Sequence, residues 1–224
     1  MIMTTTEKLR KVFGRRFTTV NLNGEVYEHI NVPQKELKFC EAVHYSFDVP
    51  IRLNHENLYC PGARRSMGFE ENDLMLAGTI AHNHLLPVSK VAESLQKIPV
   101  IKSVKHINLG LTEEMTGDIT PDLVIAYLQP DKITGFTIRL ARKGIVLNIR
   151  PFFLLSVCGS VAAACFTEQA ACLSFGCQDS RKFGGLHDDE VVLGMPWQMA
   201  LELVEPEESE MGNVTKHDEG GYPK

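Results

Sequence analysis

The sequence predicts an α/β (or α+β) protein of two pseudo-symmetric lobes, with mixed sheets flanked by helices. Three observations lead to this prediction. Strand-like and helix-like segments alternate along the chain. Residues 122–128 form a nearly continuous apolar run, which is typical of a strand buried on both faces. One pattern of cysteine, arginine, acidic residue and leucine occurs twice, which indicates an internal duplication.

In the first half, the pattern predicts helices over 4–13, 38–47 and 89–96 and strands over 17–22, 51–53 and 100–109. Asn23-Gly24 is a favoured turn pair, so a hairpin into Val26-Tyr27 is expected. Pro61 is expected to begin a helix, because proline is favoured at the first helical position.

In the second half, strands are expected over 122–128, 145–149, 170–175 and 191–193, and helices over 130–142, 152–166 and 196–204. A short turn or helix is expected over 181–185. The uncharged stretch 152–166 is shorter than the ~20 residues of a membrane span, so it predicts a buried helix. The acidic tail 205–224 is expected to be mobile or draped on the surface.

Composition excludes some classes of function. The 224 residues carry a net charge of −5, whereas nucleic-acid-binding proteins usually present a basic face. An anionic membrane surface is disfavoured for the same reason. The first 16 residues lack the apolar core of a signal peptide, so a cytoplasmic location is expected. Cysteines stay reduced there and are more often metal-binding, catalytic or buried than paired in disulfides.

The duplicated pattern places two cysteines in each predicted lobe. The first lobe, residues 1–110, contains Cys40 and Cys60, and the second, residues 111–204, contains Cys158 and Cys177. Each copy has an arginine four residues after its second cysteine and an acid thirteen residues after it. These are Arg64 with Asp73 and Arg181 with Glu190. Cys165 and Cys172 have no counterpart in the first copy and are expected to be core residues.

Four converging thiolates favour an iron–sulfur cluster or zinc. A [4Fe–4S] cluster is normally held by four cysteines, whereas structural zinc sites usually present local C-x₂₋₄-C pairs, which this chain lacks. The sequence therefore predicts a [4Fe–4S] cluster on Cys40, Cys60, Cys158 and Cys177, in electron transfer or redox chemistry. Arg64 and Arg181 are expected to offset its charge or to bind an anion.

Other interpretations remain open. One is a thiol-dependent enzyme acting on a small anionic substrate, with His187, Asp188 and Glu190 as acid/base groups. A second is a structural zinc module, and a third is that the cysteines simply pack in a core. A disulfide within either cysteine pair is a further alternative. The expected partner is a redox protein or a small anionic ligand, and whether the chain is an enzyme is left open.

His82 and His84 are two residues apart, and on a strand both rings would point to the same face. A polar loop before Pro87 is the favoured interpretation of this segment.

Several segments resemble the domain-of-unknown-function family 169, which is frequent in anaerobic archaea and bacteria. The matching residues are 39–42, 56–64, 176–177, 180–185, 188–190 and 194–196, within a stretch of roughly residues 36–197. The resemblance implies little about activity. It does single out Cys40, Cys60, Cys158 and Cys177 over the other two cysteines.

Overall fold

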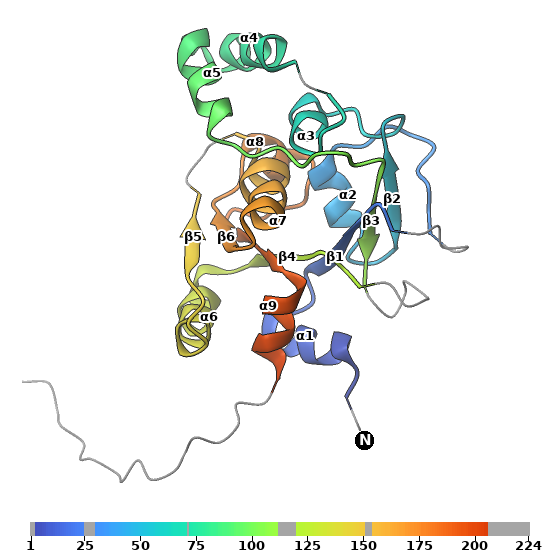
Figure 1. Cartoon of the computed structure of the whole chain (residues 1–224), viewed down its shortest axis with the longest axis vertical. Coiled ribbons are helices and arrows are strands. Elements are labelled where there is room, and N and C mark those ends of the chain that lie inside the picture. Colours follow the sequence, from blue (N-terminus) through green and yellow to red (C-terminus); the bar gives the residue numbers. More distant parts are fainter. Residues whose placement is uncertain (1–2, 25–29, 71, 112–119, 151–153, 206–224) are drawn as a thin grey trace, which may run out of the picture.

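The computed structural model describes residues 3–24, 30–70, 72–111, 120–150 and 154–205. These residues form a seven-stranded mixed sheet with helices on both faces, which confirms the mixed α/β class (Figure 1). The segment at Val26-Tyr27, which was predicted to form a hairpin, and residues 206–224 of the tail lie outside the described residues.

The strands are β1 (Phe17–Leu22), β2 (Ile51–Asn54), β3 (His106–Gly110), β4 (Leu123–Leu128), β5 (Leu147–Ile149), β6 (Ala171–Ser174) and β7 (Val191–Pro196). The helices are α1 (Thr5–Phe13), α2 (Phe39–Tyr45), α3 (Pro61–Ser66), α4 (Asp73–His84), α5 (Val88–Gln96), α6 (Pro130–Arg142), the π-helix η1 (Ser156–Ala163), α7 (Ala164–Glu168), α8 (Gln178–Lys182) and α9 (Trp197–Val204).

The strand order is β2-β3-β1-β4-β7-β6-β5. Neighbouring strands are antiparallel, except for the parallel pair β5–β6 at one edge. Outward from the central β1–β4 pair, β3 and then β2 lie on one side, and β7 and then β6 on the other. The strands of both halves join in one sheet. The duplication and the lobe boundaries therefore stay predictions.

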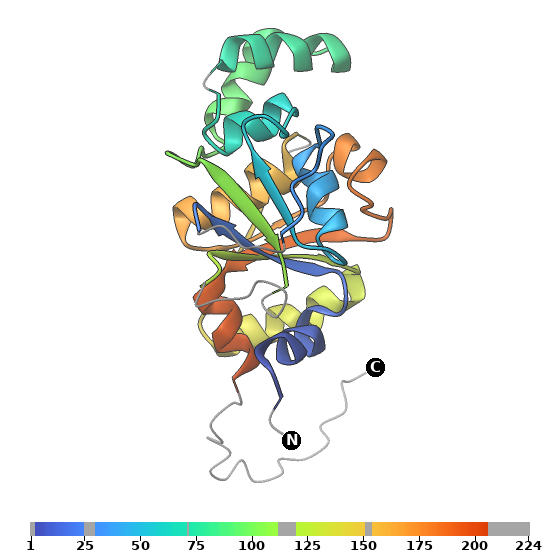
Figure 2. The same ribbon diagram turned by 90° about the vertical axis from the view of Figure 1, so that its right-hand side faces the viewer.

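Helices cover the sheet on both faces (Figure 2). α1, α6 and α9 lie against one face, and α2, α3, η1, α7 and α8 lie against the other. The central strand β4 contributes to both cores, because Val124 and Ala126 pack with the first group, whereas Ile125 and Tyr127 pack with the second. All six β4 residues are buried, as the apolar run predicted.

Local signals explain several element boundaries. α1 begins with a capping box, in which the Glu7 amide donates to the Thr4 hydroxyl and the Thr4 amide donates to the Glu7 carboxylate. α3 begins at Pro61, as predicted. Of the buried helix predicted over 152–166, residues 156–166 lie in η1 and α7, and every residue of η1 is buried, whereas residues 152–153 lie outside the described residues. Among the described residues, no helix has the length and apolar character needed to cross a bilayer.

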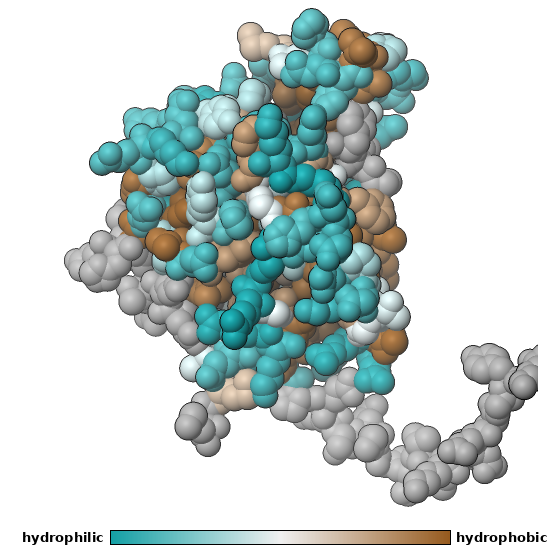
Figure 3. Space-filling model, turned by 180° about the vertical axis from the view of Figure 1, so that it is seen from behind, coloured by the Kyte–Doolittle hydropathy of each residue, from teal (hydrophilic) through white to brown (hydrophobic). Residues whose placement is uncertain are grey.

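α4 and α5 form a helical pair at one end of the molecule (Figure 1). The helix predicted over 89–96 is α5, whereas α4 was not predicted. The segment around His82 and His84 was expected to be a loop or strand, but it is the last turn of α4. Leu74, Met75 and Leu85 are 77%, 65% and 93% exposed. Seen from behind, hydrophobic residues are visible at this end of the molecule (Figure 3).

Candidate functional site

Four separate elements bring four cysteines to the wall of one cavity. Cys40 lies in the first turn of α2, Cys158 in η1, and Cys60 and Cys177 immediately before α3 and α8. All four line a cavity of about 460 Å³. Cys165 and Cys172 do not line it and are fully buried in the core, as predicted. The fold therefore separates the six cysteines into the two groups that the repeat distinguished.

Cys60 and Cys177 are presented in the same way. Each has extended backbone dihedrals and is the N-cap residue of a short helix. The arginine four residues later folds back onto the carbonyl two residues before the cysteine. Arg64 Nη1 lies 3.1 Å from the Leu58 oxygen, and Arg181 Nη2 lies 2.6 Å from the Phe175 oxygen. Each arginine thus fixes the loop that delivers its cysteine.

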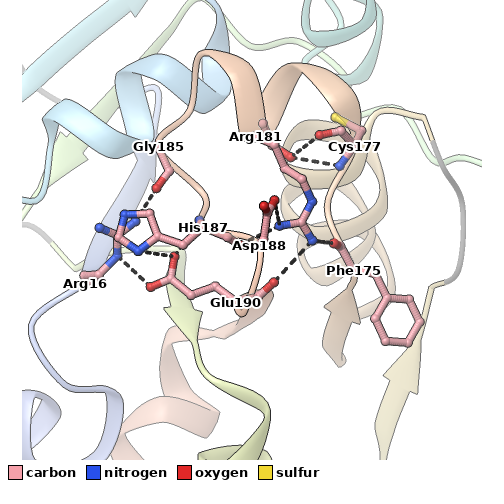
Figure 4. Close-up of polar contacts among 9 residues, drawn as sticks. Arg16, Phe175, Cys177, Arg181, Gly185, His187, Asp188 and Glu190 are labelled. Carbon is pink, nitrogen blue, oxygen red and sulfur yellow. Dashed lines mark hydrogen bonds and ion pairs between the residues drawn. The ribbon is translucent and has the colours of Figure 1, made fainter.

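This clamp is a different role from the one predicted for the two arginines. Arg64 also donates to the His55 carbonyl and pairs with Glu70 at 2.9 Å. Arg181 also donates to the carbonyl oxygens of His187 and Glu190 (Figure 4). Neither arginine is among the residues that line the cavity. Their guanidinium groups therefore stabilise the loops rather than facing the thiols.

An unusual backbone conformation holds Cys158. η1 is a π-helix, a rare form that is frequent at functional sites, and it follows Leu155, which has a left-handed conformation with φ of 49°. Both Leu155 and Cys158 line the cavity. A Cβ on Gly62 would lie 3.0 Å from Leu155 Cγ, so glycine at the start of α3 lets it pack closely against this turn. Close packing of α3 and η1 brings Cys60 and Cys158 into one site.

The thiols strongly affect one another because they share a poorly solvated space. Burial raises the pKa of Cys40, and the nearby Cys177 and Cys60 raise it further. Burial also raises the pKa of Cys158, where Cys60, Cys177 and Cys40 again add to the effect. Two of the other thiols therefore influence the pKa of Cys40, and all three others influence that of Cys158. In the metal-free protein, Cys40 and Cys158 therefore stay protonated at neutral pH.

Lys38 supplies a cation at the cavity wall. Its Nζ lies 2.6 Å from Asp179 Oδ2 and near the ring faces of Tyr59 and Phe183. Burial alone would lower the pKa of Lys38, but the hydrogen bond with Asp179 and the charge of Cys60 raise it overall. Lys38 in turn opposes the burial-driven rise in the pKa of Cys60. Sequence reasoning missed this residue, although it lies two positions before Cys40.

The backbone amides after Cys60 act in the same direction. Burial raises the pKa of Cys60, whereas hydrogen bonding from the Ala63 and Gly62 amides lowers it. The Ser66 hydroxyl similarly opposes the burial-driven rise in the pKa of Cys158. The site therefore contains backbone N–H donors suited to anionic sulfur.

α4 forms the remaining wall of the cavity. Its lining residues recur at helical spacing and are Leu76, Thr79, Ile80, Asn83 and His84. His82 is exposed and does not line the cavity, so the two histidines do not act as a pair. The sequence signal that could have located α4 is the N-cap Asn72, whose side chain accepts from the Met75 amide.

The predicted acid/base residues do not line the cavity. Glu190 is buried and pairs with Arg16, with Nε and Oε1 2.9 Å apart. It also accepts from the His187 amide, which stabilises the turn before β7. Asp188 is fully exposed, and the side chain of His187 is 64% exposed. These groups have local structural partners, and none of them contacts the cysteine cavity.

Within the part of the chain that the structure describes, no three His, Cys, Asp or Glu side chains are close enough together to hold a single metal ion. The four cysteines instead stand around the cavity wall. This spacing matters for the choice of cofactor, because a single zinc ion needs its donors around one point.

A sequence model of the domain-of-unknown-function family 169, described as "Uncharacterised ArCR", matches residues 18–206. The chain is also similar to the uncharacterized protein MJ0308 of Methanocaldococcus jannaschii, with 22% identity over 197 residues, which covers 81% of this chain and 80% of that protein. No solved structure matches the chain significantly. Because the family model spans most of its length, the chain belongs to the domain-of-unknown-function family 169.

Proposed function

We propose that the protein holds an iron–sulfur cluster, of the [4Fe–4S] type, on Cys40, Cys60, Cys158 and Cys177, and that it serves electron transfer or redox chemistry. The supporting observation is that these four cysteines, from four elements and both halves of the chain, line one cavity. A core role alone gives no reason for four thiols to surround a space of about 460 Å³.

The arrangement of donors favours a cluster over zinc. In a [4Fe–4S] cluster each cysteine binds a different iron, so the sulfur atoms stand apart around a bulky core. A single zinc ion needs its donors about 2.0–2.3 Å from one point. The described residues offer no such compact group of three donors, whereas the cysteines are distributed around a cavity.

The site also contains groups that can compensate the negative charge of a cluster. Four thiolates on an oxidised cubane leave a net charge of about −2, which is costly to bury without partners. Lys38 and the amides of Gly62 and Ala63 all favour the thiolate form of Cys60. These groups replace Arg64 and Arg181 in the charge-compensating role that the sequence predicted.

A cluster with four cysteine ligands supplies electron transfer, because no iron has an open coordination position. This protein's own residues would hold it, exclude bulk water and set its charge environment. The cavity wall formed by α4 adds an amide at Asn83 and an imidazole at His84. We therefore propose that a redox partner protein or a small anionic ligand approaches on the α4 side.

A thiol-dependent enzyme acting on a small anionic substrate is the second candidate. The specific observation that favours it is Lys38, which lowers the pKa of the partly exposed Cys60 against the effect of burial. The Cys60 thiol thus stands beside a cation that favours its thiolate form and could attract an anionic substrate, although burial keeps its pKa above the ordinary value.

The two candidates separate in one experiment. The protein is purified without oxygen, and its visible absorption spectrum is compared with those of Cys60→Ala, Cys177→Ala and the matched control Cys165→Ala. A cluster predicts brown protein for the wild type and the control, and loss of colour in the other two variants. Colourless wild-type protein, with rapid alkylation of Cys60 alone, would favour the thiol enzyme.

A further inference from the structure

Two thiols outside the cavity form a separate pair. Cys165 in α7 and Cys172 in β6 are both fully buried, and their side chains are hydrogen-bonded to each other. Neither thiol takes part in the cavity. The proposed cluster does not use them, so their pairing needs a separate explanation.

A glycine in the sheet leaves space for the side chains of Cys165 and Cys172. Cys172 is directly opposite Gly194 of the neighbouring strand β7, and such antiparallel partners have Cα atoms about 4.5–5.5 Å apart. A Cβ on Gly194 would lie 3.1 Å from Cys165 Sγ. The Cys165 sulfur therefore sits over the Cys172–Gly194 pair, in space that glycine leaves free.

The surroundings shift the pKa values of the two thiols in opposite directions. The hydrogen bond from Cys165 lowers the pKa of Cys172, against the opposing effect of burial, and Arg150 lowers it further. Burial raises the pKa of Cys165, so this thiol retains its proton. One thiol is thus activated as a nucleophile, and the other is placed to resolve the product, as in dithiols that exchange with disulfides.

Because both thiols are fully buried, access to them requires local opening, for which the edge of the sheet is the nearest candidate. β6 is covered on one side by β5, an edge strand of three residues, in which Asn148 pairs with Cys172. Arg150, which follows β5, forms an ion pair with Glu168. A short edge strand with exposed residues opens locally at low cost in free energy.

From these contacts, we propose that Cys165 and Cys172 are a thiol–disulfide exchange site. A low-molecular-weight disulfide oxidises the two thiols, and the product is a reversible disulfide between Cys165 and Cys172. The Cys172 thiolate attacks one sulfur of the reagent, whose S–S bond breaks and releases one thiolate. Cys165 then attacks Cys172 Sγ in the mixed disulfide and releases the second thiolate. The two protons of the dithiol convert both leaving groups to thiols, so the protein is oxidised by two electrons and the reagent is reduced by two.

The Cys165–Cys172 pair is connected through the chain to the cavity cysteines Cys158 and Cys177. η1 and α7 are consecutive helices, so Cys165 is on the helical segment that also carries Cys158. Cys172 is five residues before Cys177, in the strand that leads to it. A disulfide would tie these two segments together. The inference does not depend on the proposed cluster, because it concerns other cysteines.

The test uses the full chain with Cys158→Ser and Cys177→Ser, so that no cluster forms on the four-cysteine set and no other cysteine remains between the tryptic sites Lys143 and Arg181. The folded protein is incubated with oxidised glutathione, alkylated, and cleaved with trypsin and a glutamate-specific protease, which cuts after Glu168. The expected product is a disulfide linking the peptide of Cys165 to that of Cys172. Reductant should remove the link, and so should the additional change Cys165→Ser.

Full alkylation of both thiols, a glutathione adduct without the link, or a link that forms only in denaturant would overturn the proposal. If the double variant does not fold, the same treatment is applied to the wild-type chain. Fragmentation of its peptide then assigns the disulfide, because Glu168 and Gln169 lie between the two cysteines. A disulfide joining any other two cysteines in that experiment counts against the inference.

Discussion

Lys38 and Asp179 join the two halves of the chain at the cysteine cavity. Nζ of Lys38 lies 2.6 Å from Oδ2 of Asp179, although 141 residues separate them in sequence. Lys38 is two residues before Cys40, and Asp179 is two residues after Cys177. Each half thus contributes two cysteines and one member of this ion pair, so charge and thiols come together only in the folded chain.

The ion pair predicts opposite effects of two substitutions on the reactivity of Cys60. Burial is the main cause of its raised pKa, which Lys38 lowers and Asp179 raises. Lys38→Met should therefore raise the pKa of Cys60 further, and Asp179→Asn should lower it. The measurement is the pH dependence of the alkylation rate of Cys60 in metal-free protein. Shifts in the same direction for both variants would contradict this electrostatic account.

The buried thiols predict a loss of stability at alkaline pH in metal-free protein. Burial raises the pKa of Cys40, Cys60 and Cys158 above the ordinary value of 9.0. Above about pH 9, the unfolded chain releases these protons while the folded chain keeps them. Each such thiol then lowers the free energy of unfolding by about 1.4 kcal/mol per pH unit, up to its folded pKa.

Urea unfolding between pH 7 and pH 10 measures this slope. Replacing the three thiols by serine should flatten the alkaline part of the curve, because serine does not titrate there. An equally steep decline in the serine variant would assign the effect to other groups.

The glycine contacts predict which helix positions tolerate a methyl group. A Cβ on Gly159 would lie 2.6 Å from Ile98 Cγ2, and one on Gly62 would lie 3.0 Å from Leu155 Cγ. Each alanine variant should lose about 1–3 kcal/mol of unfolding free energy, because the added methyl group would overpack Gly159 against Ile98 or Gly62 against Leu155. Gly78→Ala is the matched control, since nothing lies within 4 Å of its Cβ and alanine favours a helix. Equal losses at all three positions, measured by urea unfolding, would contradict the packing described.

The arginine clamps predict matched effects in the two halves. Arg64→Ala and Arg181→Ala each remove hydrogen bonds to loop carbonyls, so each should cost about 1–3 kcal/mol in unfolding free energy. The lysine variants should recover little of this, because lysine lacks the guanidinium fork. If alanine lowered anion affinity but left thermal stability unchanged, the arginines would be ligand-binding residues after all.

Much of the fold follows from periodicity, but two helices illustrate its limits. In α4 the apolar residues Leu74 and Met75 point to solvent, which weakens the contrast between its faces, and Gly78 and Thr79 are poor helix formers. The stretch predicted as one helix over 152–166 contains a π-helix, because sequence periodicity does not encode the hydrogen-bond register.

The residues of the candidate site could be predicted only in part, because sequence spacing marks related positions but does not reveal contacts between distant residues. Repeated spacing identified the four cysteines, since a duplicated pattern marks equivalent positions. The same spacing identified Arg64 and Arg181 as equivalent but did not reveal that both turn toward backbone carbonyls. Lys38 gave no signal in the sequence, because its role depends on a contact with the other half of the chain.

The central claim is tested most directly by iron and acid-labile sulfide counts on protein purified without oxygen. About four irons and four sulfides per chain, lost in Cys60→Ala and Cys177→Ala but kept in Cys165→Ala, are the result that we predict. Wild-type protein with neither iron nor sulfide, or with one zinc ion per chain, would contradict the assignment of a cluster to Cys40, Cys60, Cys158 and Cys177.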